Sequence, residues 1–395
     1  MSTSLVVLIL SLLLGVQPVT TDLYLPALPT ITAELGASMA QAQLTLSGLL
    51  LAFGLSQLVW GPVSDRFGRR PVLLLGLGAY TVAAVGSMLA ASMEALLIWR
   101  ILQGAAMGAG VMCARALVRD LYTPEAGARA ISKGLSGLGV IACVSIPVGA
   151  VLAEFLGWRA ALAALAVFGA VSLGMVAMRF EETLKSPNPR ALSPATLLRT
   201  WAGILSNRTF WAFALLAMMS YGGLFTFLAA SSFVFMGLMD ISKPLYGVLM
   251  FTMAVSYLLG TFLCRWLLRH HGVHRAVAIG GGLSLAGGSL IGLLALAGGE
   301  GVWAIMLPVY LFMLGHGVHQ PCGQSGAVGP FPHAAGAASA LSGFLMMLSA
   351  FAMGSWLGAN MDGTRFPLTN GMWFWGVMTA LVAWGLVYRS RPRPA

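Results

Sequence analysis

Long apolar segments that recur about every 30 residues constrain this 395-residue chain more than any other feature. Residues 5–15, 47–59, 71–91 and 276–299 are examples, and none of these runs contains a charged residue. A helix needs about 20 predominantly apolar residues to cross a hydrocarbon core of about 30 Å. The segments are too long and too uniformly apolar for barrel strands. Only 9% of the residues are charged, whereas a soluble domain carries about a quarter. We therefore expect an all-α membrane protein.

The apolar segments divide into two sets of six, separated by a single long polar stretch. We predict twelve spans with approximate bounds 4–29, 40–62, 71–91, 95–117, 131–153, 158–179, 209–233, 244–268, 275–298, 302–326, 334–358 and 371–388. The proline-containing segment 181–208 would link an N-terminal six-helix bundle (1–180) to a C-terminal one (209–395). An even number of spans per half predicts two pseudo-symmetric bundles related by an axis along the membrane normal.

Basic residues are distributed unevenly over the predicted loops. With a cytoplasmic N-terminus, 18 of the 22 basic residues, Arg391 and Arg393 among them, fall on the inner side. The outer loops receive three: Arg159, Lys243 and Arg365. This asymmetry follows the positive-inside rule, so it explains the net charge of +10 without a nucleic-acid partner. We predict a multi-pass protein of a bacterial inner membrane with both termini cytoplasmic.

Two charges remain inside the spans after the loops are assigned: Asp22 and Arg100. At 1.5 Å per residue they lie roughly 11 Å and 8 Å below the outer boundary, so they can be level. A charge within the bilayer is costly and marks a functional candidate with a partner. The pair could be a structural ion pair, or it could be a protonation switch in which the acid binds and releases a proton.

Several motifs resemble those of one transporter family. Residues 61–71, Gly-Pro-Val-Ser-Asp-Arg-Phe-Gly-Arg-Arg-Pro, resemble the signature loop of the major facilitator superfamily. Residues 100–104, Arg-Ile-Leu-Gln-Gly, resemble a motif of its drug:proton antiporters. Residues 22–29, Asp-Leu-Tyr-Leu-Pro-Ala-Leu-Pro, resemble the first span of the bicyclomycin-resistance (Bcr/CflA) subfamily. The resemblance implies alternating access, with proton coupling assigned to Asp22 and Arg100.

The same resemblance implies that the loop between spans two and three acts as a conformational latch. A carboxylate there would be favoured by about 0.3–1 kcal/mol near the N-terminus of span eleven, around Ala334. A tight hydrophilic turn that only enforces topology is the alternative. The candidate latch residues are Asp65, Arg66, Gly68, Arg69 and Arg70.

The resemblance also implies that spans one, four, seven and ten line the substrate cavity. The candidate substrate-binding residues on these spans are Gln17, Tyr24, Gln103, Tyr221, Phe225, His316 and His319. The aromatic residues suit adaptable apolar ligands. The two histidines could line the cavity, titrate, pack between helices or bind a metal, and we favour no metal site. Pro321, among several glycines, predicts a bent or broken span ten.

The sequence therefore predicts proton-coupled efflux of small, amphipathic or drug-like molecules. An importing symporter or a facilitator on the same fold is the alternative. No catalytic motif lies in or beside the spans, so we do not expect an enzyme. The expected partners are substrate, protons and the bilayer, and we expect a monomer without a cofactor. The four cysteines are scattered singly and are interpreted as packing residues.

Overall fold

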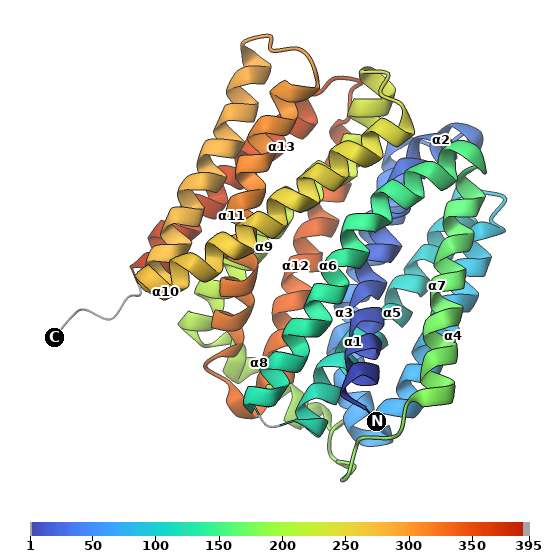
Figure 1. The fold of residues 1–395 in the computed structure, drawn as a ribbon, viewed down its shortest axis with the longest axis vertical. Helices are drawn as coiled ribbons and strands as arrows, with labels where there is room; N and C mark the ends of the chain where they lie inside the picture. Colours follow the sequence, from blue (N-terminus) through green and yellow to red (C-terminus); the bar gives the residue numbers. More distant parts are fainter. Residues whose placement is uncertain (1, 123, 390–395) are drawn as a thin grey trace. The chain divides into compact units, whose positions relative to one another are not determined.

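The structure, a computed structural model, describes residues 2–122 and 124–389 of the chain. Within these residues every element of regular secondary structure is a helix, which confirms the all-α prediction (Figure 1). Arg391 and Arg393 lie outside the described residues. The elements are α1 (Thr3–Asp22), η1 (Leu25–Ala27), α2 (Leu28–Glu34), α3 (Met39–Phe67), α4 (Arg69–Met88), α5 (Met93–Leu121), α6 (Pro124–Phe155), α7 (Trp158–Arg179), α8 (Pro194–Leu205), α9 (Arg208–Ser232), η2 (Phe233–Leu238), α10 (Lys243–Leu296), α11 (Val302–Val328), η3 (Pro332–Ala334), α12 (Ala335–Asn360), α13 (Phe366–Val382) and η4 (Ala383–Tyr388).

The described residues contain eleven helical segments that are long and apolar enough to cross a membrane. The longest of them, α10, is two helices that meet at Gly272, whose φ of 71° and ψ of 173° are not helical. A side chain is strained at this positive φ, and glycine is not. Gly272 falls between the predicted spans 244–268 and 275–298, so the twelve-span architecture is confirmed.

The first span is broken where the sequence predicted one continuous helix. α1 ends at Asp22, and a short turn and η1 precede α2. Pro26 has no N–H to donate to the Asp22 carbonyl, and Pro29 has none for the Leu25 carbonyl. The two prolines therefore account for a break that begins at Asp22.

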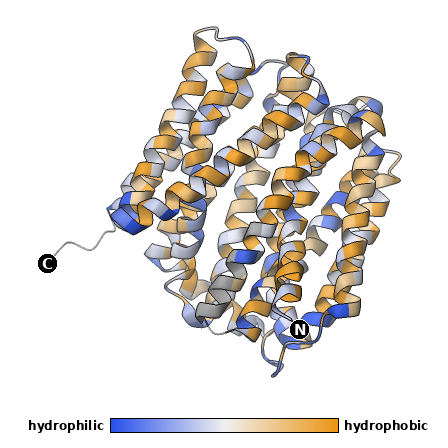
Figure 2. Ribbon diagram, viewed as in Figure 1, coloured by the Kyte–Doolittle hydropathy of each residue, from blue (hydrophilic) through white to orange (hydrophobic). Residues whose placement is uncertain are grey.

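Contacts between helices divide the chain into two compact units, Met1–Gly203 and Ile204–Ala395. In the first unit α5 packs against α3 and α4, α4 also packs against α7, and α1 packs against α6. In the second unit α10 packs against α11 and α13, and α9 packs against α11 and α12. Figure 2 shows hydrophobic residues along the helices and hydrophilic residues at several helix ends. Large apolar side chains such as Leu75 and Val82 are more than half exposed, as in helices that face lipid.

Of the bend or break expected at Pro321, the break is absent, because α11 continues as one helix through both Pro308 and Pro321. Its backbone packs closely on α10: a Cβ on Gly317 would lie 2.7 Å from the Cα of Gly260. Small residues permit such approach between membrane helices. We infer that this packing holds α11 in shape although the proline removes one backbone hydrogen bond.

Candidate functional site

Arg100 on α5 is completely buried and held by groups that carry no formal charge. Its Nη2 donates to the Thr20 carbonyl at 3.0 Å, and its Nη1 donates to Oε1 of Gln103 at 2.9 Å. Its guanidinium carbon lies 4.2 Å from the centre of the Tyr24 ring. A cation over an aromatic face is favoured by about 2 kcal/mol when both are desolvated. The arrangement thus lowers the cost of a buried cation without an acid.

Two buried tyrosines fix the groups around Arg100. The Tyr24 hydroxyl and the Thr45 hydroxyl share a hydrogen bond of 2.7 Å, and the Tyr80 hydroxyl and the Thr20 hydroxyl share another of 2.7 Å. These bonds connect the end of α1 to α3 and to α4. The sequence did not identify Tyr80 as part of this network, because it lies in the predicted span 71–91, which contains no charged residue.

Asp22 is half-buried at the end of α1 and lies two residues from the carbonyl that Arg100 contacts. Its Oδ1 accepts a hydrogen bond of 2.8 Å from the Thr21 hydroxyl. Among the described residues no ion pair joins Asp22 to Arg100. Close approach of the two side chains stays a prediction for another conformational state.

Two donors in this network lack an acceptor among the described residues: Nε of Arg100 and Nε2 of Gln103. Both side chains are fully buried, and a buried donor without an acceptor is costly. A water molecule or an acceptor that arrives with substrate would satisfy them. Gln17 lies five residues before Asp22 on α1 and is half-buried.

The candidate residues of the second unit lie on α9 and α11. Phe225 is buried and Tyr221 is half-buried. Nδ1 of His316 and the Ser220 hydroxyl are 2.8 Å apart, and the His316 ring centre lies 5.4 Å from that of Tyr257. These contacts join α11 to α9 and α10.

His319 is also buried and its contacts are with α10. Its Nε2 lies 3.3 Å from the Val277 carbonyl, and its Nδ1 lies 3.5 Å from the Ser284 hydroxyl. No group of three His, Cys, Asp or Glu side chains able to hold a metal occurs in the described part of the chain. The Sγ atoms of Cys264 and Cys322 are 3.7 Å apart between α10 and α11, a proximity that the scattered spacing did not indicate.

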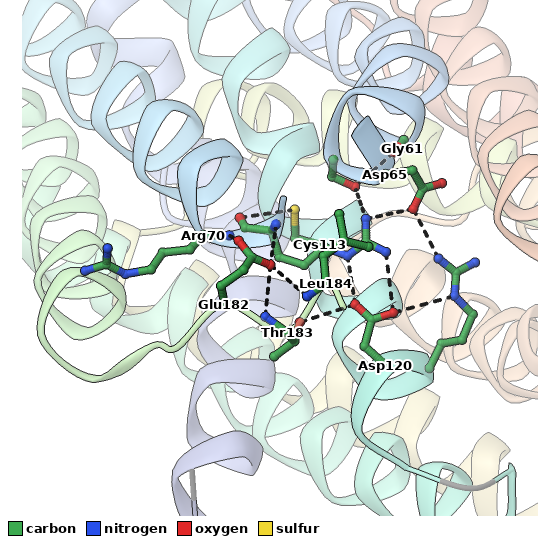
Figure 3. Close-up of polar contacts among 11 residues, drawn as sticks. Gly61, Asp65, Arg70, Cys113, Asp120, Glu182, Thr183 and Leu184 are labelled. Atoms are coloured by element: carbon green, nitrogen blue, oxygen red, sulfur yellow. Dashed lines mark hydrogen bonds and ion pairs between the residues drawn. The ribbon is translucent and has the colours of Figure 1, made fainter. Parts of the chain in front are cut away.

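A second polar cluster surrounds the connection between α3 and α4 (Figure 3). Arg69 is 1% exposed. Its Nη1 lies 2.7 Å from Oδ1 of Asp65, and its Nε lies 2.8 Å from Oδ2 of Asp120 at the end of α5. Arg119 also contacts Oδ1 of Asp65, at 3.2 Å. We call Asp65, Arg69, Arg70, Asp120 and Glu182 the loop cluster.

Glu182, in the segment after α7, contributes an acceptor to the loop cluster that the sequence analysis missed. Its carboxylate accepts backbone N–H bonds of 3.0 Å from Arg69, 3.0 Å from Arg70, 2.9 Å from Thr183 and 2.8 Å from Leu184. Partial burial alone would raise the pKa of this carboxyl, but the four N–H donors outweigh it and hold the pKa below its ordinary value.

The remaining candidate latch residues take different positions. Gly68 joins α3 to α4 with a φ of 101°. Arg70 donates from Nε to the Phe180 carbonyl and from Nη2 to the Ala177 carbonyl, each at 3.0 Å. Arg66 is exposed and its guanidinium lies 5.4 Å from the centre of the Phe67 ring. Arg66 therefore stands apart from the loop cluster.

Comparison with known proteins agrees with this architecture. The family model of the Major Facilitator Superfamily matches residues 10–355. The chain is 31% identical over 325 residues to the chloramphenicol resistance protein of Pseudomonas aeruginosa, covering 81% of this chain and 75% of that protein. It is 26% identical over 391 residues to the bicyclomycin resistance protein homolog of Haemophilus influenzae, covering 98% of each. In fold it is similar to the Escherichia coli xylose transporter XylE in a partially occluded inward-open conformation, with a TM-score of 0.74 at 15% identity over 98% of each chain.

The fold and the match over most of the chain define a membrane transporter, not an enzyme. The protein belongs to the major facilitator superfamily. The resemblance of residues 61–71 to the superfamily is confirmed by the family model, and the resemblance of residues 22–29 and 100–104 to its drug-resistance members is confirmed by the relatives.

Proposed function

We propose that this transporter exports small, amphipathic or drug-like molecules across the bacterial inner membrane in exchange for protons. Both termini would then be cytoplasmic, as the loop charges predict. Two relatives are named for resistance to chloramphenicol and to bicyclomycin. These names support export as the direction, and they supply the first compounds to test.

The observation that carries the proposal is that the buried charge of Arg100 is held by uncharged groups, while Asp22, two residues from the Thr20 carbonyl, forms no ion pair with it among the described residues. Thr20, Gln103 and Tyr24 accommodate the charge of Arg100. The Asp22 carboxyl can therefore bind and release a proton, and Arg100 keeps its uncharged partners in both cases. A permanent ion pair would make protonation of the acid much less favourable.

Proton coupling follows from competition at one site. When the site faces the acidic side, Asp22 binds a proton; when it faces the cytoplasm, arriving substrate favours its release. Gln103 and Arg100 each have a donor that finds no acceptor in the described part of the chain, and an oxygen atom of substrate or water would satisfy either. Substrate binding and proton binding can thereby alter the same network.

The adaptable part of the substrate site would come from aromatic and polar side chains. Tyr24 lies against Arg100 and Gln17 is one of the polar residues of α1. Tyr221 and Phe225 offer large apolar surfaces. His316 and His319 would add polar contacts. Their hydrogen bonds to other helices of their own unit also suit a structural role.

The loop cluster would set the balance between conformations. Asp65 and Arg69 do not belong to the network around Arg100, so they can influence transport without contacting the substrate. They can do so only by stabilising one conformational state over the other.

Transport by inverted membrane vesicles that contain the protein tests the proposal. In inverted membrane vesicles with an acidic lumen, an exporter of this type accumulates chloramphenicol inside, and it does so only while the pH gradient lasts. A facilitator equilibrates the compound without accumulation. A proton symporter moves it out of the acidic lumen. Either of these results would contradict proton-coupled export.

A further inference from the structure

We propose that Glu182 is a positioning residue that docks the segment following α7 onto the N-terminus of α4. The orientation of the loop at 61–71 then depends on that segment. The inference concerns contacts within the first unit, and it rests on the proposed transport function only for its kinetic consequence.

The N-terminus of α4 needs an external acceptor. The first four N–H groups of a helix have no partner within it, and they carry partial positive charge. Gly68 occupies the N-cap position and has no side chain to accept them. The carboxylate of Glu182 fills this role, with Oε1 on the N–H of Arg69 and Oε2 on the N–H of Arg70.

Gly68 leaves the space that this carboxylate occupies. A Cβ at position 68 would lie 2.5 Å from Oε2 of Glu182 and 3.0 Å from its carboxyl carbon. The φ of 101° also favours glycine at this position. Position 68 therefore requires glycine for two reasons: the positive φ of the turn and the space that the Glu182 carboxylate occupies.

Arg70 makes the complementary contact at the other helix end. Its guanidinium donates to the carbonyls of Ala177 and Phe180, where α7 terminates. Carbonyls at a helix C-terminus favour a cation, just as its N-terminus favours an anion. An acid from the segment after α7 thus caps the N-terminus of α4, and a base from α4 caps the C-terminus of α7.

The docked segment also reaches the buried arginine of the loop cluster. The Thr183 hydroxyl donates to Oδ2 of Asp120 at 3.2 Å, and the same oxygen accepts from Nε of Arg69 at 2.8 Å. Thr183 is 8% exposed. Glu182 and Thr183 together couple the segment to both the backbone and the side chain of Arg69. Release of Glu182 should therefore loosen the loop cluster and slow the conformational step.

Cys113 provides a reporter that does not require transport. It is fully buried on α5, and its Sγ lies 4.0 Å from the Arg69 carbonyl (Figure 3). In protein whose other three cysteines are replaced by alanine, N-ethylmaleimide should modify Cys113 only when this region opens. The measured quantity is the modification rate in folded, purified full-length protein.

Glu182→Gln should raise the Cys113 modification rate roughly threefold to tenfold, because the neutral amide presents one acceptor and an N–H₂ group to four N–H donors. Glu300→Gln, which removes the same charge from an exposed position in the second unit, should leave the rate near that of the parent. Glu182→Asp, which keeps the charge on a shorter side chain, should fall between them. Equal rates for Glu182→Gln and Glu300→Gln would overturn the proposal.

Transport measurements then separate this proposal from the proposed function. Glu182→Gln should lower the initial rate of transport while the substrate Kd stays within roughly twofold of the parent value. If the parent does not export any tested compound but the Cys113 rates differ as expected, docking stands and the proposed function fails. If Glu182→Gln protein does not fold, the Glu182→Asp and Glu300→Gln rates decide: equality between them overturns docking.

Discussion

The guanidinium of Arg100 lies against the face of Tyr24, 4.2 Å from the ring centre, although Asp22 is only two residues away from Tyr24 in the chain. Tyr24 lies in the turn between α1 and η1, where its ring covers the guanidinium. An aromatic ring contributes favourable electrostatics to a cation without adding a negative charge. Arg100 can thereby remain charged whether Asp22 is protonated or not.

Substitution of Tyr24 tests this contact. Tyr24→Phe keeps the ring and loses the hydrogen bond to Thr45, which should cost about 0.5–1.5 kcal/mol of stability. Tyr24→Leu loses the ring as well, and the cost should rise by about a further 2 kcal/mol. Thermal unfolding in detergent should therefore rank the parent above Tyr24→Phe and Tyr24→Phe above Tyr24→Leu. Equal midpoints for the two variants would show that the ring does not stabilise Arg100.

The loop cluster should affect the rate of transport and not the affinity for substrate. Asp65→Asn removes the acidic partner of two partly exposed ion pairs, with Arg69 and with Arg119, together worth about 1 kcal/mol. The transport rate should therefore fall by up to about fivefold with an unchanged substrate Kd. Arg69→Ala removes the buried cation that pairs with both Asp65 and Asp120, and it should slow transport more.

Arg66→Ala is the matched control for these loop variants, because Arg66 is exposed and lies outside the cluster. It should transport at nearly the parent rate. A loss of substrate binding in Asp65→Asn, with an unaltered conformational balance, would contradict the role assigned to the loop.

The sequence predicted the spans well because each depends on local composition. About twenty consecutive apolar residues indicate a membrane-spanning helix wherever they occur. Asp22 and Arg100 were found by elimination once the loop charges were assigned. The partners of these charges depend on contacts between distant helices. The Tyr80–Thr20 bond and the Glu182 docking have no local pattern, so periodicity and composition could not reveal them.

Pro26 and Pro321 illustrate the same limit for helix geometry. Both remove a backbone hydrogen bond, but α1 breaks four residues before Pro26 and α11 continues through Pro321. The difference lies in the surroundings, because Gly317 packs directly against the α10 backbone. The effect of a proline in a membrane helix therefore requires the neighbouring helices to be known.

Thiol labelling tests the predicted sidedness. In protein whose native cysteines are replaced, single cysteines at Glu34, Glu94 or Asp240 should react with impermeant maleimide added outside intact cells. Cysteines at Arg66 or Lys185 should react only after the membrane is opened. Arg66 is a better probe than Arg69, which is buried. The opposite pattern at two of these loops would overturn the assigned topology.

The depressed pKa of Glu182 predicts a pH dependence with a definite sign. A carboxyl whose pKa is lower in the folded state adds stability above its unfolded pKa, about 4.3, and this contribution is lost as the pH falls through the folded value. The difference in melting temperature between parent and Glu182→Gln should therefore be constant from about pH 6 to 8 and should shrink below about pH 4. A difference that disappears between pH 6 and 8 would contradict the ionised docking contact.

Proton-driven accumulation by Asp22→Asn protein tests the central claim most directly. Asparagine matches aspartate in shape and cannot exchange a proton in this pH range, so the variant should fold, insert and retain binding of a neutral compound. In inverted vesicles with an acidic lumen, the parent should accumulate chloramphenicol, and Asp22→Asn protein at equal abundance should only equilibrate it. An Asp22→Asn protein that still accumulates the compound with the parent's proton stoichiometry would contradict the account. The coupling group would then have to be sought at His316 or His319.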